Sequence, residues 1–255
     1  MEKTEKELVL NGLLVQSYFK KSLEKSKGNI LLLHGWGVSA SIFNSLAEFL
    51  TKENFDVYLI DFPGFGKSPA PKMPLALENY SLLAKEFIEK EIQEETIVLA
   101  HSFGGRVAIK LTSNFSQLVK KLVLIDSAGF VKKGLKNTLI KIFAQIFKPI
   151  FKLPAFSSLK IKIYKKIGTE DYLSNLELKK TYANIVKEDL TEELKKISVE
   201  TIIIWGKDDK TTPLSWGKKM HKLIKNSKFY EIKGDHFCFL DNPSEFNFIL
   251  KNILS

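Results

Sequence analysis

The sequence predicts an α/β fold with a mostly parallel sheet, and three features of the chain support that prediction. Eight short runs of aliphatic and β-branched residues recur along the chain. The middle runs are continuously apolar, which is typical of strands buried on both faces. Helical patterns, with apolar residues every three or four positions, separate the later runs. This alternation favours a parallel sheet flanked by helices.

The predicted elements begin with a hairpin, because the first two runs are separated only by Asn11 and Gly12, a pair that favours a two-residue turn. Helices are expected between the later strands and after the last one. The strands are predicted in residues 7–10, 13–19, 29–35, 56–62, 96–102, 122–129, 201–206 and 228–234, and the helices in residues 41–54, 77–92, 104–115, 213–226 and 243–254.

One connection is far longer than the others. About 70 residues of helical character separate the sixth and seventh strands, whereas connections in α/β units are usually short. We therefore expect a helical cap at 129–195, inserted after strand 6 into a core formed by 1–128 and 196–255. Ligands of open α/β sheets bind beyond the carboxyl ends of the strands, so a cap there would cover the active site.

Composition indicates an ordinary globular protein. The 255 residues are 44% hydrophobic and 27% charged, and a chain of this length can bury one sizeable core. Cys238 is the single cysteine, which excludes an intrachain disulfide. The N-terminal residues lack the apolar segment of a signal peptide, and no run approaches the roughly 20 apolar residues of a membrane span. We expect a cytoplasmic location.

The net charge of +10 arises in one segment. Residues 130–166 contain ten lysines and no acidic residue. Arg106 is the only arginine in the chain, whereas proteins that read nucleic acids rely on the bidentate guanidinium. We therefore expect no nucleic-acid partner, and we interpret the surplus as a lysine-rich surface.

Ser102 is the candidate nucleophile. It lies between the strand TIVLA and the helix GGRVAIKL, where Gly104 and Gly105 allow a tight turn that would present the hydroxyl above the sheet. The competing interpretation is an ordinary helix N-cap, a position where serine is common. The G-x-S-x-G pattern of such turns is incomplete, because Ala100 replaces its first glycine.

A serine hydroxyl needs a base to accept its proton, and His236 is the candidate. It lies in the loop after the last predicted strand, at the end of the sheet where carboxyl ends of strands meet. The other histidines are less well placed: His34 in HGWG, His101 beside the serine and His221 in a lysine-rich helix.

The histidine needs a carboxylate that fixes its tautomer and stabilises the imidazolium. Asp208 and Asp209 both follow the penultimate strand, and we favour Asp209, four residues before Pro213. Asp126 follows the sixth strand and is the reserve candidate, although an aspartate there is also a common turn residue.

The oxyanion of an acyl-transfer intermediate needs rigid backbone donors. Gly35 and Gly37 flank Trp36 at a strand end, where the chain can expose an amide. The amides of Trp36 and Phe103 are therefore the predicted oxyanion hole. Structurally, HGWG is also an ordinary glycine-rich turn.

These segments resemble the α/β-hydrolase family, in particular its esterase-like members with a helical cap. The matching segments are HGWG, DFPGFGKS, AHSFGG, WGKDDKTTP and GDHFCFLDNPSEF, running from residue 34 to 246 in the order serine, acid, histidine. The resemblance implies a triad of Ser102, Asp209 and His236 with no metal and no organic cofactor. The sequence departs from the family at Ala100 and at Asp235, where glycine commonly precedes the histidine, and neither change removes a catalytic group.

The predicted cap suggests an apolar substrate. Residues 137–153 carry an apolar helical stripe, from which Phe143, Phe147 and Phe151 would line an acyl pocket. A basic amphipathic helix of this kind can instead lie on a membrane surface. The lysines could also receive an acidic carrier protein, as in the family's carrier-protein methyl esterases, or reflect composition alone.

The sequence thus predicts a cofactor-free serine hydrolase, a carboxylesterase acting on a small-molecule ester with a hydrophobic acyl group. Lactonase, carbon–carbon bond hydrolase, aminopeptidase and carrier-protein methyl esterase activities would use the same triad. Haloalkane dehalogenases and epoxide hydrolases of this family have an aspartate where this chain has Ser102. A slow-turnover ligand receptor on the hydrolase fold is an alternative of a different class. The oligomeric state is left open.

Overall fold

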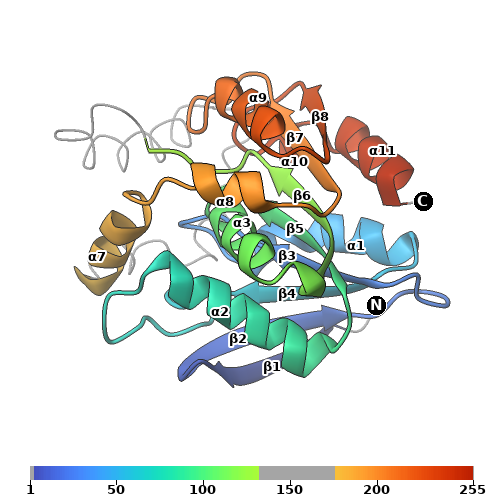
Figure 1. The fold of residues 1–255 in the computed structure, drawn as a ribbon. Coiled ribbons are helices and arrows are strands. Elements are labelled where there is room, and N and C mark those ends of the chain that lie inside the picture. Colours follow the sequence, from blue (N-terminus) through green and yellow to red (C-terminus); the bar gives the residue numbers. More distant parts are fainter. Residues whose placement is uncertain (1–2, 132–175, 255) are drawn as a thin grey trace, which may run out of the picture.

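A computed structural model describes residues 3–131 and 176–254 of the chain. Its strands form one sheet in the order β1-β2-β4-β3-β5-β6-β7-β8 (Figure 1). β1 and β2 run antiparallel to their neighbours, and the other strands are parallel. The predicted α/β fold is confirmed. The strands are β1 (Lys3–Leu10), β2 (Leu13–Lys20), β3 (Asn29–Leu33), β4 (Asp56–Asp61), β5 (Thr96–His101), β6 (Val119–Ile125), β7 (Thr201–Gly206) and β8 (Ser227–Ile232).

Helices cover both faces of the sheet (Figure 1). One face packs against α2, α3, α8 and α9, and the other against α1, α10 and α11. The helices are α1 (Asn44–Lys52), α2 (Leu77–Phe87), α3 (Phe103–Asn114), α7 (Leu176–Ile185), α8 (Thr191–Lys196), α9 (Leu214–Leu223), α10 (Cys238–Asp241) and α11 (Pro243–Leu254), with single turns η1 (Ala40–Phe43), η2 (Ile88–Ile92) and η3 (Ser116–Leu118).

The middle strands are apolar throughout because each face packs against its own layer of helices. In β5 every residue is buried. Val98 and Ala100 belong to the core under α2 and α3, whereas Ile97 and Leu99 belong to the core under α1 and α11. Successive side chains of a strand point to opposite faces, so this alternation needs an uninterrupted apolar run.

The opening hairpin forms as predicted, with φ of 48° at Asn11 and 73° at Gly12. Positive φ at both central residues matches the right-handed twist of the two strands. β1 begins at Lys3, earlier than the predicted start, and pairs with β2 along its whole length. Its first residues alternate charges rather than apolar side chains, because β1 is an edge strand of the sheet.

The long insertion follows β6 and ends at β7, as predicted. Its described part includes α7 and α8, and α8 packs against α3 and α9. Residues 132–175 lie outside the described part, and with them the predicted acyl-pocket residues Phe143, Phe147 and Phe151. A separate cap at 129–195 therefore stays a prediction.

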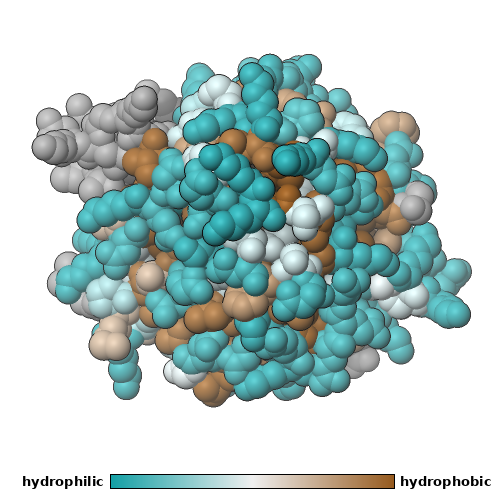
Figure 2. All heavy atoms as spheres, in the orientation of Figure 1, coloured by the Kyte–Doolittle hydropathy of each residue, from teal (hydrophilic) through white to brown (hydrophobic). Residues whose placement is uncertain are grey.

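The surface seen in Figure 2 is mostly hydrophilic, with hydrophobic side chains between the polar ones. Within residues 3–131 and 176–254, each helix is too short or too polar to cross a membrane.

Candidate active site

Ser102 lies at a strained turn between β5 and α3, with φ 52° and ψ −110°. A positive φ is unfavourable for a residue with a Cβ, and such strain is concentrated at functional sites. The following glycines make room for the turn. A Cβ on Gly104 would lie 2.2 Å from the carbonyl oxygen of Leu33, and one on Gly105 would lie 2.0 Å from Ser127 Oγ.

The hydroxyl of Ser102 is directed to a histidine rather than to the helix. Ser102 occupies the N-cap position of α3, but its side chain makes no capping hydrogen bond. Ser102 Oγ instead lies 2.9 Å from His236 Nε2. The competing N-cap interpretation therefore describes the position of Ser102 but not the direction of its hydroxyl.

His236 connects the serine to a carboxylate. Its Nδ1 lies 2.8 Å from Asp209 Oδ2. An ionised carboxylate only accepts hydrogen bonds, so Nδ1 carries the ring proton and Nε2 is free to accept from the serine hydroxyl. The structure thus brings together three predicted residues from the loops that follow β5, β7 and β8.

Asp209 is held by the loop in which it lies. Its Oδ1 accepts the amides of Thr211 at 2.7 Å and Thr212 at 2.9 Å, and its Oδ2 accepts Thr212 Oγ at 2.6 Å. Burial alone would raise the pKa of Asp209, but the hydrogen bond and charge of His236, together with those donors, hold the pKa below its usual range. Asp209 therefore stays ionised at neutral pH.

Burial alone would lower the pKa of His236, but the hydrogen bond and the charge of Asp209 outweigh it and raise the pKa above the ordinary histidine value. The nearby carboxylates of Asp126 and Asp235 act in the same direction. A basic imidazole next to a serine hydroxyl is the arrangement that general-base catalysis requires.

Asp126, the reserve acid, is buried but does not take the place of Asp209. Its Oδ1 accepts the amide of Gly206 at 2.7 Å and its Oδ2 accepts the amide of Cys238 at 3.3 Å. Burial, reinforced by the charge of Asp209, raises the pKa of Asp126 to about 7. Asp126 thus joins the ends of β6 and β7 to the loop that carries His236.

His101 supports the same loop, a role that the sequence analysis missed. Its Nε2 donates to the backbone carbonyl of His236 across 2.7 Å. Burial, helped by the charge of His236, lowers the pKa of His101 to about 3, so the ring is neutral. Its position beside Ser102 was the available signal, because a residue next to Ser102 lies close to the histidine that Ser102 contacts.

The loop after β3 places Trp36 beside the serine. His34 anchors this loop, with Nδ1 donating to Gly35 O at 2.7 Å and Nε2 accepting the amide of Phe62 at 2.9 Å. The Trp36 ring packs edge-on against Phe103, with centroids 5.2 Å apart. The two predicted oxyanion residues are therefore neighbours.

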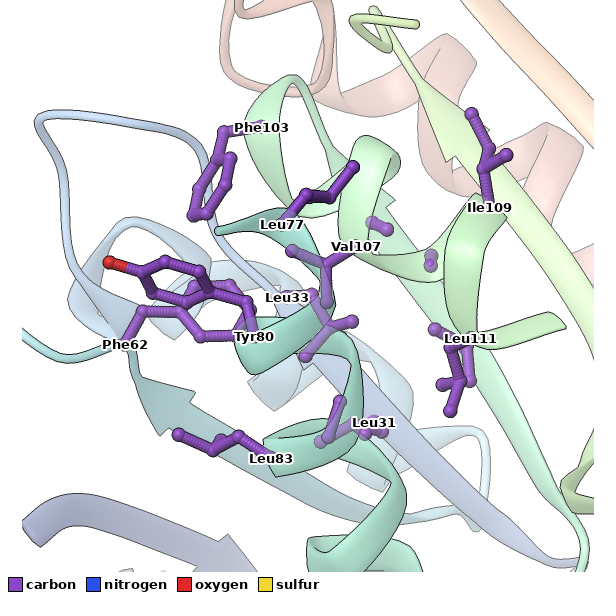
Figure 3. Packing of buried hydrophobic residues seen from close by; sticks show 14 of the residues in the cluster. Leu31, Leu33, Phe62, Leu77, Tyr80, Leu83, Phe103, Val107, Ile109 and Leu111 are labelled. Carbon is purple, nitrogen blue, oxygen red and sulfur yellow. The ribbon is translucent and has the colours of Figure 1, made fainter. Parts of the chain in front are cut away.

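Phe103 is the first residue of α3, so helix geometry leaves its amide without an intrahelical partner. Its ring is anchored in the core and points toward Tyr80 and Phe62, with centroid distances of 5.0 and 5.4 Å (Figure 3). This packing fixes the start of the helix that follows the serine.

The segment DFPGFGKS forms a second ordered loop at this end of the sheet. Asp61 accepts Tyr18 Oη, the amide of Ala40 and the amide of Lys67. A Cβ on Gly66, whose φ is 58°, would lie 2.1 Å from Asp61 Oδ2. The glycine is therefore required by the close approach of that carboxylate.

In the described ranges, 3–131 and 176–254, no group of three or more histidine, cysteine, aspartate or glutamate side chains is arranged to hold a metal ion.

A mostly parallel eight-stranded sheet, with a serine at the turn after β5 and an acid and a histidine after β7 and β8, has the architecture of the alpha/beta hydrolases. The model of the alpha/beta hydrolase family matches residues 30–247. The chain belongs to that family and is a hydrolase.

Similar proteins span several hydrolase activities. One is the pimeloyl-[acyl-carrier protein] methyl ester esterase of Wigglesworthia glossinidia brevipalpis, 24% identical over 93% of this chain and 97% of that protein. Another is the 2-hydroxy-6-oxononadienedioate/2-hydroxy-6-oxononatrienedioate hydrolase 1 of Pseudomonas putida, 25% identical over 91% and 89%. The structure of the enol-lactonase from Burkholderia xenovorans LB400 has a TM-score of 0.85 at 17% identity, covers 98% of this chain and 99% of that one, and shows the shared fold.

Proposed function

We propose that the protein is a cofactor-free serine esterase that cleaves a carboxylic ester through an acyl-enzyme on Ser102. The main support is the chain of hydrogen bonds from Ser102 Oγ through His236 to Asp209, with contacts of 2.9 and 2.8 Å. In this arrangement each group has the partner that its role requires, a nucleophile on a base and a base on an orienting carboxylate.

In the acylation step, His236 Nε2 takes the proton of Ser102 as Oγ attacks the ester carbonyl. The carbonyl oxygen becomes an oxyanion, which the amides of Trp36 and Phe103 stabilise. Asp209 stabilises the imidazolium while the charge is present. The tetrahedral intermediate collapses, the carbon–oxygen bond to the alcohol breaks, and His236 returns its proton to the leaving alkoxide.

In the deacylation step, His236 accepts a proton from water, which attacks the acyl carbonyl. Collapse of the second intermediate breaks the bond to Ser102 Oγ, which recovers the proton from His236. The products are one carboxylic acid and one alcohol, and the catalyst is regenerated without a metal or an organic cofactor.

The surroundings of Ser102 favour a hydrophobic acyl group. Trp36 packs against Phe65, Phe103 and Tyr182, with ring centroids 4.8 to 5.2 Å apart. These rings form an aromatic cluster beside the nucleophile, and apolar walls of this kind select apolar substrates.

The test is the hydrolysis of p-nitrophenyl esters of increasing acyl length by the wild type and by Ser102→Ala. Loss of the nucleophile should lower kcat by roughly 10⁴-fold or more with the fold intact. Ser113→Ala, on the same helix, is the control and should retain activity. Hydrolysis by Ser102→Ala at the wild-type rate would refute the proposal. A single burst of product from the wild type, without further turnover, would favour the slow-turnover receptor.

A carrier-protein methyl ester is the second candidate substrate. Two similar proteins are named pimeloyl-[acyl-carrier protein] methyl ester esterases, and residues 130–166 carry ten lysines and no acidic residue. An acidic carrier would be attracted to such a segment, and the attraction would weaken with salt. A kcat/KM for the carrier-bound methyl ester that exceeds that of the free ester, and falls with ionic strength, would favour this substrate.

A further inference from the structure

Arg106 is the only arginine of the chain, and it lies on α3 four residues after Ser102. Its side chain is buried, with 3% of the residue exposed. The guanidinium donates to two backbone carbonyls, from Nη1 to Glu188 at 2.7 Å and from Nη2 to Phe130 at 3.3 Å.

These two carbonyls belong to opposite ends of the insertion between β6 and β7. Phe130 lies shortly after β6, and Glu188 lies between α7 and α8. We call residues 129–131 and 188–190 the stem. The two halves of the stem are also joined directly, because the amide of Leu190 donates to Gly129 O at 2.9 Å. Arg106 therefore ties both halves of the stem to the helix that starts at the serine.

The geometry suits an arginine better than a lysine. A guanidinium is a planar fork that directs separate N–H groups at two acceptors, whereas the single ammonium of a lysine acts as a point charge. Burial lowers the pKa of Arg106 to about 10, which leaves the group protonated at neutral pH. A buried cation is unfavourable unless its donors are satisfied, so the two carbonyls and the guanidinium hold each other in place.

The stem leads directly to the site. α7 ends just before it, and Tyr182 of α7 is only 9% exposed. The Tyr182 ring packs on Trp36, with centroids 5.2 Å apart, and Trp36 packs on Phe103 at the same distance. The stem is thus connected to the aromatic cluster beside Ser102 through one helix.

We propose that Arg106 is a positioning residue that holds α7, and with it Tyr182, against Trp36, and thereby sets which acyl groups reach Ser102. The specificity part rests on the proposed esterase function. Arg106 itself touches neither substrate nor reacting atoms.

The experiment compares Arg106→Lys with the wild type on p-nitrophenyl acetate and p-nitrophenyl octanoate. The octanoate-to-acetate ratio of kcat/KM should change by about tenfold or more. The change should arise in KM, with kcat for acetate within about twofold of the wild type. Leu111→Ala is the matched control, because Leu111 is buried on the same helix but packs in the core (Figure 3), so it should lower Tm without changing the ratio.

A second measurement does not depend on catalysis. Amide hydrogen exchange in 182–190 should accelerate by about tenfold in Arg106→Lys, with exchange in α2 unchanged. In a Tyr182→Ala background, Arg106→Lys should add less than about a twofold further change in the ester ratio, because the two residues act through one contact.

The outcomes separate this proposal from the proposed function. An unchanged ester ratio, including an equal loss of kcat/KM on both esters, would overturn the specificity role. Unchanged exchange in 182–190 would overturn the positioning role. If Ser102→Ala were as active as the wild type, the esterase mechanism would fail, and the exchange measurement would still decide whether Arg106 positions α7.

Discussion

Replacing Asp209 by asparagine tests whether Asp209 orients His236, the proposed base. The two side chains are isosteric, and the environment determines how the new amide would lie. The amides of Thr211 and Thr212 both donate to Oδ1, so the one oxygen that the asparagine side chain retains would stay there. The new NH₂ would then replace Oδ2, 2.8 Å from His236 Nδ1.

An NH₂ group at that point reverses the tautomer of His236. Because it donates, Nδ1 must become the acceptor, and the ring proton moves to Nε2, which faces Ser102. The histidine can then no longer accept the serine proton. Loss of one hydrogen bond to a charged group costs about 1.5–3 kcal/mol. A reversed tautomer in a serine triad lowers kcat about 10⁴-fold, equivalent to about 5.5 kcal/mol.

The assay is steady-state hydrolysis of p-nitrophenyl acetate by Asp209→Asn, Asp126→Asn and the exposed control Asp208→Asn. We expect Asp209→Asn to lose roughly 10⁴-fold in kcat and Asp208→Asn to be unchanged. A loss of about 150-fold or less in Asp209→Asn is what the lost hydrogen bond alone would produce, and would refute the tautomer argument. A larger loss in Asp126→Asn than in Asp209→Asn would show that the reserve residue is the true acid.

Two further predictions concern the pKa of His236 and the packing around Gly104. Since the pKa of His236 is raised and the base must be neutral, kcat/KM should rise with pH through an inflection above 6.5, and an inflection at or below that value would contradict the role of Asp209. Gly104→Ala should lower the free energy of unfolding by about 1–3 kcal/mol in urea denaturation, because its Cβ would overlap Leu33 O. The control Ser113→Ala should change that free energy by less than about 0.5 kcal/mol, and an equally stable Gly104→Ala would contradict the close approach.

Much of the fold could be predicted because buried parallel strands have a strong local signal. The run at β5 is buried at every position, and the adjoining helical pattern has a different period. The start of β1 had no such signal. Its lysines and glutamates pair along β2 at the edge of the sheet, where solvation rather than burial decides the residue type.

The association of Ser102, Asp209 and His236 was predictable because the carboxyl ends of parallel strands meet at one edge. Their support was not predictable in the same way. The bond from His101 to the His236 carbonyl and the two acceptor bonds of Asp126 depend on how neighbouring strand ends are aligned across the sheet. No local pattern carries that information.

The insertion between β6 and β7 has a consequence for how the protein folds. Strands β1 to β6 can assemble through connections less than half as long as the insertion, but β7 can pair with β6 only after the chain closes a loop over residues 126–200. That loop is roughly four times as long as the connection between β5 and β6, and its closure costs about 1.2 kcal/mol more in entropy. Ser102 precedes this loop in the chain, whereas Asp209 and His236 follow it. A partly folded chain therefore carries Ser102 without the histidine that contacts it, and recovery of hydrolysis during refolding would report the arrival of the last two strands.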